Sequence, residues 1–205
     1  MSRTDASREL TGIVLAGGLS TRLGYDKAAL RLDGAAGADL LAHSVALVSE
    51  VCSKTLIIGR SVPGHACVPD DCPGLGPVGG VATALRAAQS ACLAISCDLP
   101  FMTSAVLQRL IDAHAKRPES ALSTSYRQQG SSYPEALVAI YEYACLPFFE
   151  DCVSKRLLKI SLVVPEKHRH FLLYPPDEAL PFFNINSPDD LETALRLRKA
   201  NGSSR

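Results

Sequence analysis

The segment 13–27 constrains this chain more than any other, because an apolar run breaks there into a glycine-rich turn that carries Arg22 and Lys27. The run has the aliphatic and β-branched character of a buried strand. Gly17 and Gly18 allow a backbone approach that a Cβ would block, so N–H groups of the turn can face an anion. A guanidinium and an ammonium both suit phosphate oxygens. The segment therefore predicts a strand that leads into a phosphate-binding loop.

Composition is that of an ordinary globular protein. The chain has 205 residues, of which 47% are hydrophobic and 20% charged. We expect a single domain over 1–205, with a polar start at 1–9 and a tail at 200–205. The 21 basic and 21 acidic residues cancel, so no general attraction to nucleic acid or to an anionic membrane is expected. Any anion must be bound locally.

The chain shows no targeting or membrane signal. Its first ten residues are polar, and no stretch reaches the roughly 18 consecutive apolar residues of a membrane span. The seven cysteines include no Cys-x-x-Cys pair, which argues against a zinc ribbon or a redox motif. We expect a cytoplasmic protein with reduced thiols.

Strand-like and helix-like patterns alternate along the sequence. Helical spacing of apolar residues covers 39–51, 78–88 and 104–116, and strand-like runs cover 55–58, 92–96, 121–125 and 137–141. Further on, short extended pieces are expected at 162–164 and 170–173, a polar mobile loop at 127–132, and a last helix after Ser187-Pro188. This alternation predicts an α/β fold of three layers, Rossmann-like, with a mainly parallel sheet and helices on both faces.

Asp98 follows the most apolar strand, and the next residues, Leu99-Pro100, end it. The carboxylate should therefore project at the carboxyl edge of the sheet, where ligands bind in open α/β folds. A nucleotide site needs a hard oxygen ligand for Mg²⁺, and Asp98 is the best placed residue for that role. A cap on the local turn is the alternative role for the same side chain.

Two further polar segments are candidates for ligand binding. Residues 70–80 are rich in glycine and proline and run into a helix start, whose N–H groups could cover a base or ribose; a plain solvent loop fits as well. Asn184 and Asn186 alternate in an extended run, so both amides should face one side and could meet a phosphate or a second substrate. Amides that satisfy local turns are the alternative.

Several of these segments resemble sequence motifs of a known enzyme family. The motif Leu-Ala-Gly-Gly-x-Ser-x-Arg-Leu-Gly-x-Asp-Lys at 15–27 is very similar to the signature of nucleotidyltransferases, and most similar to that of the molybdenum cofactor guanylyltransferase family. The pieces at 76–80, 97–100 and 182–191 resemble further motifs of that family, so the likeness spans about 11–198. It implies a fold of the nucleotide-diphospho-sugar transferase type. It also implies Mg²⁺-dependent transfer of GMP from GTP to the phosphate of molybdopterin or molybdenum-molybdopterin, releasing pyrophosphate.

The resemblance also assigns roles to residues. Those it makes catalytic are Arg22, Lys27 and Asp98, with Asp98 on the metal. Those it places on GTP are Leu15, Ala16, Gly17, Gly18, Lys27, Asp71, Gly76, Gly80 and Asp98. Asn184 and Asn186 are the acceptor-binding pair, and proteins of molybdoenzyme maturation are further partners it suggests.

One departure from the family stands out: Gly59 occupies a place where some relatives have Asn, which leaves Arg60 or the backbone for any contact there. Basic residues for an acceptor phosphate are also sparse, the available ones being Lys155, Arg156, Lys159, Lys167 and Arg169. Three other functions stay open. They are cytidylyl transfer to the same cofactor, nucleotidyl transfer to another small phosphorylated acceptor, and a non-catalytic GTP-binding role in enzyme maturation.

Overall fold

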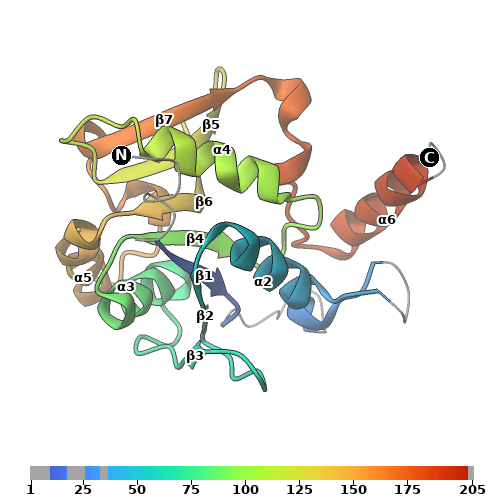
Figure 1. The fold of residues 1–205 in the computed structure, drawn as a ribbon, viewed down its shortest axis with the longest axis horizontal. Coiled ribbons are helices and arrows are strands. Elements are labelled where there is room, and N and C mark those ends of the chain that lie inside the picture. The colour runs from blue at the N-terminus through green and yellow to red at the C-terminus, as the bar shows by residue number, and fades with distance from the viewer. Residues whose placement is uncertain (1–9, 18–25, 33–36, 203–205) are drawn as a thin grey trace.

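A seven-stranded sheet forms the centre of the protein. The computed structural model describes residues 10–17, 26–32 and 37–202. The sheet order is β3-β2-β1-β4-β6-β5-β7 (Figure 1), with β1 Thr11–Leu15, β2 Lys54–Ile58, β3 Cys67–Val68, β4 Cys92–Ser96, β5 Ser123–Gln128, β6 Pro134–Tyr141 and β7 Arg169–Tyr174. The first four strands are parallel to one another, and β5 is parallel to β7. Strand β6 runs antiparallel to both of its neighbours, β4 and β5.

Helices cover both faces of this sheet (Figure 1). They are α2 Leu40–Val51 and α4 Ser104–His114 on one face, and α3 Gly76–Ala88 and α5 Leu146–Ser154 on the other. Neighbouring residues of β1 show the division, because Val14 packs with the α2 and α4 side chains and Ile13 packs with those of α3 and α5. Both are completely buried, as the near-continuous apolar run of a parallel strand requires. The expected three-layer α/β fold is confirmed.

The last helix, α6 Pro188–Gly202, extends from one end of the sheet (Figure 1). Its start is fixed by a reciprocal pair: Ser187 Oγ accepts from the Asp190 backbone N–H at 3.2 Å, and Asp190 Oδ2 accepts from the Ser187 N–H at 2.8 Å. The helices α2 and α4 begin in a similar way, since Asp39 and Thr103 each accept from a first-turn N–H. Polar residues at these positions supply acceptors for N–H groups that have no partner within the helix.

Three local expectations need correction. The segment 162–164, expected to be extended, begins with the last residue of a 3-10 turn at Ile160–Leu162 and forms no strand. The loop expected at 127–132 is shorter, because β5 continues through Gln128 in register with β7. The helix α6 runs on to Gly202, so the tail begins later than expected. The seven cysteines are all unpaired. Among the described residues, no helix has the length and apolar character needed to cross a membrane.

A polar cluster ties α4 to the sheet away from the site described below. The ring of buried His114 contacts Thr124 Oγ1 through Nδ1 at 2.9 Å and Glu142 Oε1 through Nε2 at 2.9 Å. Arg117 forms an ion pair with the same Glu142 oxygen. The hydrogen bond from His114 lowers the pKa of the Glu142 carboxyl, and burial lowers the pKa of His114. Both shifts favour the forms present at neutral pH.

We expect Glu142→Gln to destabilise the protein at pH 7 by about 1–3 kcal/mol, the usual cost of leaving a buried hydrogen-bond partner unsatisfied. Because the folded pKa of Glu142 is lowered, the stability it contributes is present above its unfolded pKa and is lost as pH falls through the folded pKa. The difference between wild type and variant should therefore shrink between pH 7 and pH 3.5 in urea melts. As a control, Glu150→Gln removes an exposed pair with Arg86 and should cost less than about 1 kcal/mol. An equal loss for Glu142→Gln at every pH would contradict this account.

Candidate active site

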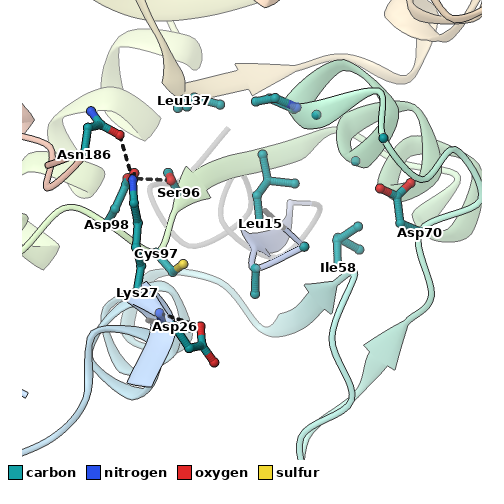
Figure 2. Close-up of a pocket in the computed structure, with 17 residues that line it drawn as sticks. Leu15, Asp26, Lys27, Ile58, Asp70, Ser96, Cys97, Asp98, Leu137 and Asn186 are labelled. Carbon is teal, nitrogen blue, oxygen red and sulfur yellow. Dashed lines mark hydrogen bonds and ion pairs between the residues drawn. The ribbon is translucent and has the colours of Figure 1, made fainter. Parts of the chain in front are cut away.

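A cavity of about 460 Å³ opens at the carboxyl edge of β1 and β4 (Figure 2). It is lined from both halves of the chain by Leu15, Ala16, Gly17, Asp26, Lys27, Ala28, Ile58, Asp70, Gly74, Gly76, Pro77, Gly80, Ser96, Cys97, Asp98, Leu137 and Asn186. The strands β1 and β4 are parallel neighbours with Leu15 opposite Ser96, so the residues that follow each strand emerge side by side. This is the edge at which open α/β sheets bind their ligands.

Four polar side chains gather at one end of this cavity. The Lys27 ammonium lies 3.6 Å from Asp98 Oδ2 and donates to Asn186 Oδ1 at 2.8 Å. The Ser96 hydroxyl donates to the other carboxylate oxygen, Asp98 Oδ1, at 2.6 Å (Figure 2). Only 19% of the Lys27 side chain and 15% of the Asp98 side chain is exposed. The structure thus brings together Lys27, Asp98 and Asn186, which the sequence placed in three separate motifs.

Asn186 is held in place by its neighbours. The Asp190 carboxylate accepts from the backbone N–H groups of Asn186 and Ser187, and the first of these bonds is the main cause of its lowered pKa. The Ile185 N–H donates to the backbone carbonyl of Asp98 at 3.1 Å, which docks this segment on the end of β4. Asn184 does not line the cavity, and its side-chain oxygen is buried without a hydrogen-bond partner. The structure therefore places one of the two predicted amides at the site.

The end of β1 passes very close to the end of β2. A Cβ on Gly59 would lie 2.7 Å from the Gly17 Cα, and Gly59 has a φ of +84°. Only glycine fits such a backbone without strain. Arg60 does not take over a cavity contact; its Nη1 pairs with Asp26 Oδ2 at 2.5 Å. Asp26 in turn accepts from the Ala28 N–H, so the pair anchors the chain beside Lys27.

The two adjacent acids before α3 point in different directions. Asp70 lines the cavity, on the side away from Asp98 (Figure 2). Its Oδ1 accepts from the Cys72 N–H at 2.9 Å and from the Thr83 hydroxyl at 3.3 Å. Asp71, which the resemblance had selected, is exposed and pairs with Arg86 at 3.4 Å. The acid that lines the cavity is therefore Asp70, and the GTP contact predicted for Asp71 stays a prediction.

Comparison with known proteins agrees with this geometry. The family model for the MobA-like NTP transferase domain matches residues 12–170. The chain belongs to this family. Its relatives include a probable molybdenum cofactor guanylyltransferase of Chloroflexus aggregans, 31% identical with 89% of this chain and 92% of that protein covered. A molybdenum cofactor guanylyltransferase of Rhizobium johnstonii is 32% identical, with 93% and 94% covered.

Solved structures give the same result. Molybdopterin-guanine dinucleotide biosynthesis protein A of Archaeoglobus fulgidus superposes with a TM-score of 0.72 at 26% identity, covering 93% of this chain and 99% of that one. A 2-C-methyl-D-erythritol 4-phosphate cytidylyltransferase of Thermus thermophilus shares the fold at 17% identity, with a TM-score of 0.64, 91% of this chain and 98% of that one covered. As a MobA-like NTP transferase, this protein is a nucleotidyltransferase, as the motifs predicted.

The cavity of this MobA-like protein contains most of the residues that the sequence nominated. Leu15, Ala16, Gly17, Gly76 and Gly80 line it with Lys27, Asp98 and Asn186. Gly18 and Arg22 lie outside the described residues, so their predicted roles stay predictions. The basic candidates Lys155, Arg156, Lys159, Lys167 and Arg169 are absent from the lining. Lys155 pairs with Asp151, for example, and Lys159 lies over the ring of Tyr133.

Sequence reasoning missed several lining residues, above all Asp70 and Ser96. Ser96 had a signal that could have found it, since it ends the same apolar strand that leads to Asp98. Leu137 had none, because it reaches the cavity only through the antiparallel pairing of β6 with β4. Cys97 also lines the cavity, and burial raises the pKa of its thiol to about 12, so the sulfur is a neutral packing group.

The site suits a cation that is bound largely by substrate phosphates and water. Within the described part of the chain, no group of three or more His, Cys, Asp or Glu side chains is arranged to hold a metal. Asp98 offers a carboxylate in contact with the Ser96 hydroxyl, and the Asn186 amide oxygen lies in the same cavity on Lys27. Mg²⁺ is commonly bound through one or two carboxylates with substrate phosphates and water completing the shell. The donor set fits such an ion.

Proposed function

We propose that this protein transfers GMP from GTP to the phosphate of molybdenum-molybdopterin, acting as a cytoplasmic enzyme with one domain over 1–205. An oxygen of the acceptor phosphate forms a bond to the α-phosphorus of GTP, and the bond from that phosphorus to the bridging oxygen breaks. Pyrophosphate leaves with the electron pair. The proposal draws on the names of the relatives and, above all, on the Lys27–Asp98–Asn186 cluster in the cavity.

We assign the GTP phosphates to the loop after β1. Ala16 and Gly17 supply backbone at the cavity wall. The proposal gives Gly18 and Arg22 further contacts with the phosphates. The Lys27 ammonium is the fixed positive charge of the site. Its task is to stabilise the negative charge that grows on the leaving pyrophosphate, which is electrostatic stabilisation by a group already in position. The acceptor phosphate is an anion at neutral pH, so the reaction needs alignment more than a general base.

We assign the nucleoside of GTP to the side of the cavity formed by the start of α3. Gly76, Pro77 and Gly80 present little side-chain bulk there, and a Cβ on Gly80 would already meet the Leu15 side chain at 3.0 Å. Asp70 has one oxygen engaged by Cys72 and Thr83, which leaves the other for N–H or O–H donors of the nucleoside. In this assignment Asp70 takes the role that the resemblance gave to Asp71.

Mg²⁺ is the metal in this proposal, and Asp98 is the residue that holds it. When bound with GTP, the ion would neutralise phosphate charge during transfer. The Lys27 ammonium lies 3.6 Å from Oδ2 of this carboxylate. Asn186, whose Oδ1 accepts from Lys27, is the acceptor-side amide, and Asn184 stays a second candidate for that role. Molybdoenzyme maturation proteins are the proposed recipients of the product.

The proposed reaction is tested by measuring pyrophosphate release with each nucleoside triphosphate, against molybdenum-molybdopterin, molybdopterin and a panel of sugar and isoprenoid phosphates. We expect GTP with the pterin acceptors to be the productive combination. Calorimetry in Mg²⁺ should show GTP binding at least about tenfold tighter than CTP or ATP, which corresponds to 1.4 kcal/mol. Preference for CTP would make the protein a cytidylyltransferase. GTP binding without turnover on any acceptor would favour the non-catalytic role.

Asp70 and Asp71 form a matched pair for the nucleoside assignment. Asp70→Asn should weaken GTP binding by about 10–100-fold, since a hydrogen bond to a charged group contributes roughly 1.5–3 kcal/mol. Asp71→Asn removes only an exposed ion pair with Arg86 and should leave the GTP dissociation constant within about threefold, because such pairs contribute little. The reverse ranking would return the role to Asp71.

Asp98→Asn keeps the shape of the side chain and removes its charge. If the carboxylate holds the metal, the variant should fold normally and lose turnover by on the order of 10²-fold or more, as other electrostatic stabilisers do when removed. GTP can still bind through the loop after β1. Melting temperature and Mg²⁺-dependent pyrophosphate release, measured on one preparation, distinguish this from a purely structural role. A destabilised variant with near-normal turnover would contradict the metal assignment.

A further inference from the structure

We propose that Ser96 is a positioning residue for the metal-binding carboxylate: its hydroxyl holds one oxygen of Asp98 so that the other faces the cation. The inference rests on the proposed function, in which Asp98 holds the metal. Neither the motifs nor the assigned roles include Ser96. It is the last residue of β4 and lines the cavity two positions before Asp98.

The two carboxylate oxygens of Asp98 have different partners. Oδ1 accepts the Ser96 hydroxyl at 2.6 Å, which is in the range of short, charge-assisted O–H···O⁻ bonds. Oδ2 lies 3.6 Å from the Lys27 ammonium, within ion-pair distance but longer than a direct N⁺–H···O⁻ bond. Oδ2 therefore retains lone pairs that a cation can use. Figure 2 shows the Ser96 hydroxyl and the Lys27 ammonium both at the Asp98 carboxylate.

The Asp98 carboxylate needs this restraint because it can still rotate about its terminal torsion, although the main chain of Asp98 is fixed. The Asp98 carbonyl accepts from the Ile185 N–H, which sets the backbone. The terminal torsion of an aspartate is broad and roughly two-fold, so the group could rotate and present both oxygens to Lys27. A carboxylate that shares two oxygens with an ammonium is a poorer ligand for a metal ion. The Ser96 hydroxyl, carried on a strand, opposes that rotation.

A merely local role is the competing explanation, since a serine two residues before an aspartate can stabilise a turn. The two roles differ in what they change. Loss of a local turn contact lowers the stability of the protein. Loss of a positioning contact lowers the affinity for the metal even in the folded protein, as partners that orient metal ligands do elsewhere.

The test measures how strongly Mn²⁺ tightens GTP binding. For each variant, calorimetry gives the GTP dissociation constant with and without Mn²⁺, and the ratio reports the metal contact without requiring turnover. We expect Ser96→Ala to reduce this ratio by about tenfold, within the 10–100-fold range for residues that orient metal ligands. The apparent KM for Mg²⁺ in pyrophosphate release should rise by a similar factor, with a smaller fall in kcat.

Ser90→Ala is the matched control. Ser90 lies just before β4, at the opposite end of the strand from the cavity, and its hydroxyl contacts Thr11 Oγ1 at 3.0 Å. The same substitution there also removes one side-chain hydrogen bond, but at a distance from the cavity. It should leave the Mn²⁺ ratio unchanged. Ser96→Thr and Ser96→Val form a second pair of equal shape, in which only Thr keeps the hydroxyl. We expect Thr to restore the ratio and Val to resemble Ala.

Two results would overturn the proposal in distinguishable ways. If Asp98→Asn abolishes the Mn²⁺ effect while Ser96→Ala and Ser96→Val keep the wild-type ratio, the metal site stands and the role of Ser96 is wrong. If Mn²⁺ fails to tighten GTP binding in the wild-type protein, or does so equally without Asp98, the proposed metal role fails and the positioning role fails with it. A lowered melting temperature with an unchanged ratio assigns Ser96 to the local turn alone.

Discussion

The ion pair between Lys27 and Asp98 is the interaction on which the site depends. It joins the loop after β1 to the end of β4, and the hydrogen bond from Lys27 to Asn186 adds the segment before α6. Both side chains are mostly buried, so either charge alone would carry a desolvation penalty. Each therefore stabilises the position of the other, and the pair holds three distant parts of the sequence around one cavity.

The parallel sheet makes this convergence possible. Because β1 and β4 are adjacent and parallel, the loops that follow them share one edge, and the antiparallel β6 adds its early residues beside them. The glycine pair at Gly17 and Gly59 allows the ends of β1 and β2 to approach without side chains between them. The cavity wall there is backbone, which suits a ligand rich in phosphate oxygens.

The sequence predicted those parts of the site that depend only on residues close together in the chain. The strand before Gly17, the strand end at Asp98 and the capped start of α6 each have a signal within a few residues, and the structure agrees with them. What it could not predict depends on orientation or on distant pairing. Asp70 and Asp71 are chemically identical neighbours, and only the turn that binds Asp70 to Cys72 and Thr83 decides which one enters the cavity. Asn184 was assigned by alternation, which assumes a regular extended run that the chain does not keep before α6.

Glycine at position 59 follows from the close approach of the β1 and β2 ends at Gly17. A Cβ at position 59 would lie 2.7 Å from the Gly17 Cα, so there is no room for a side chain here. Arg60, one residue later, instead binds Asp26, whose pKa is lowered mainly by that hydrogen bond. Asp26 immediately precedes Lys27 in the chain. The position of Lys27 is therefore fixed in two ways, by the Arg60 pair on its neighbour Asp26 and by its own pair with Asp98. The Lys27 ammonium, to which we assign the leaving pyrophosphate, is thus positioned by two ion pairs on adjacent residues, and neither pair requires a side chain at position 59.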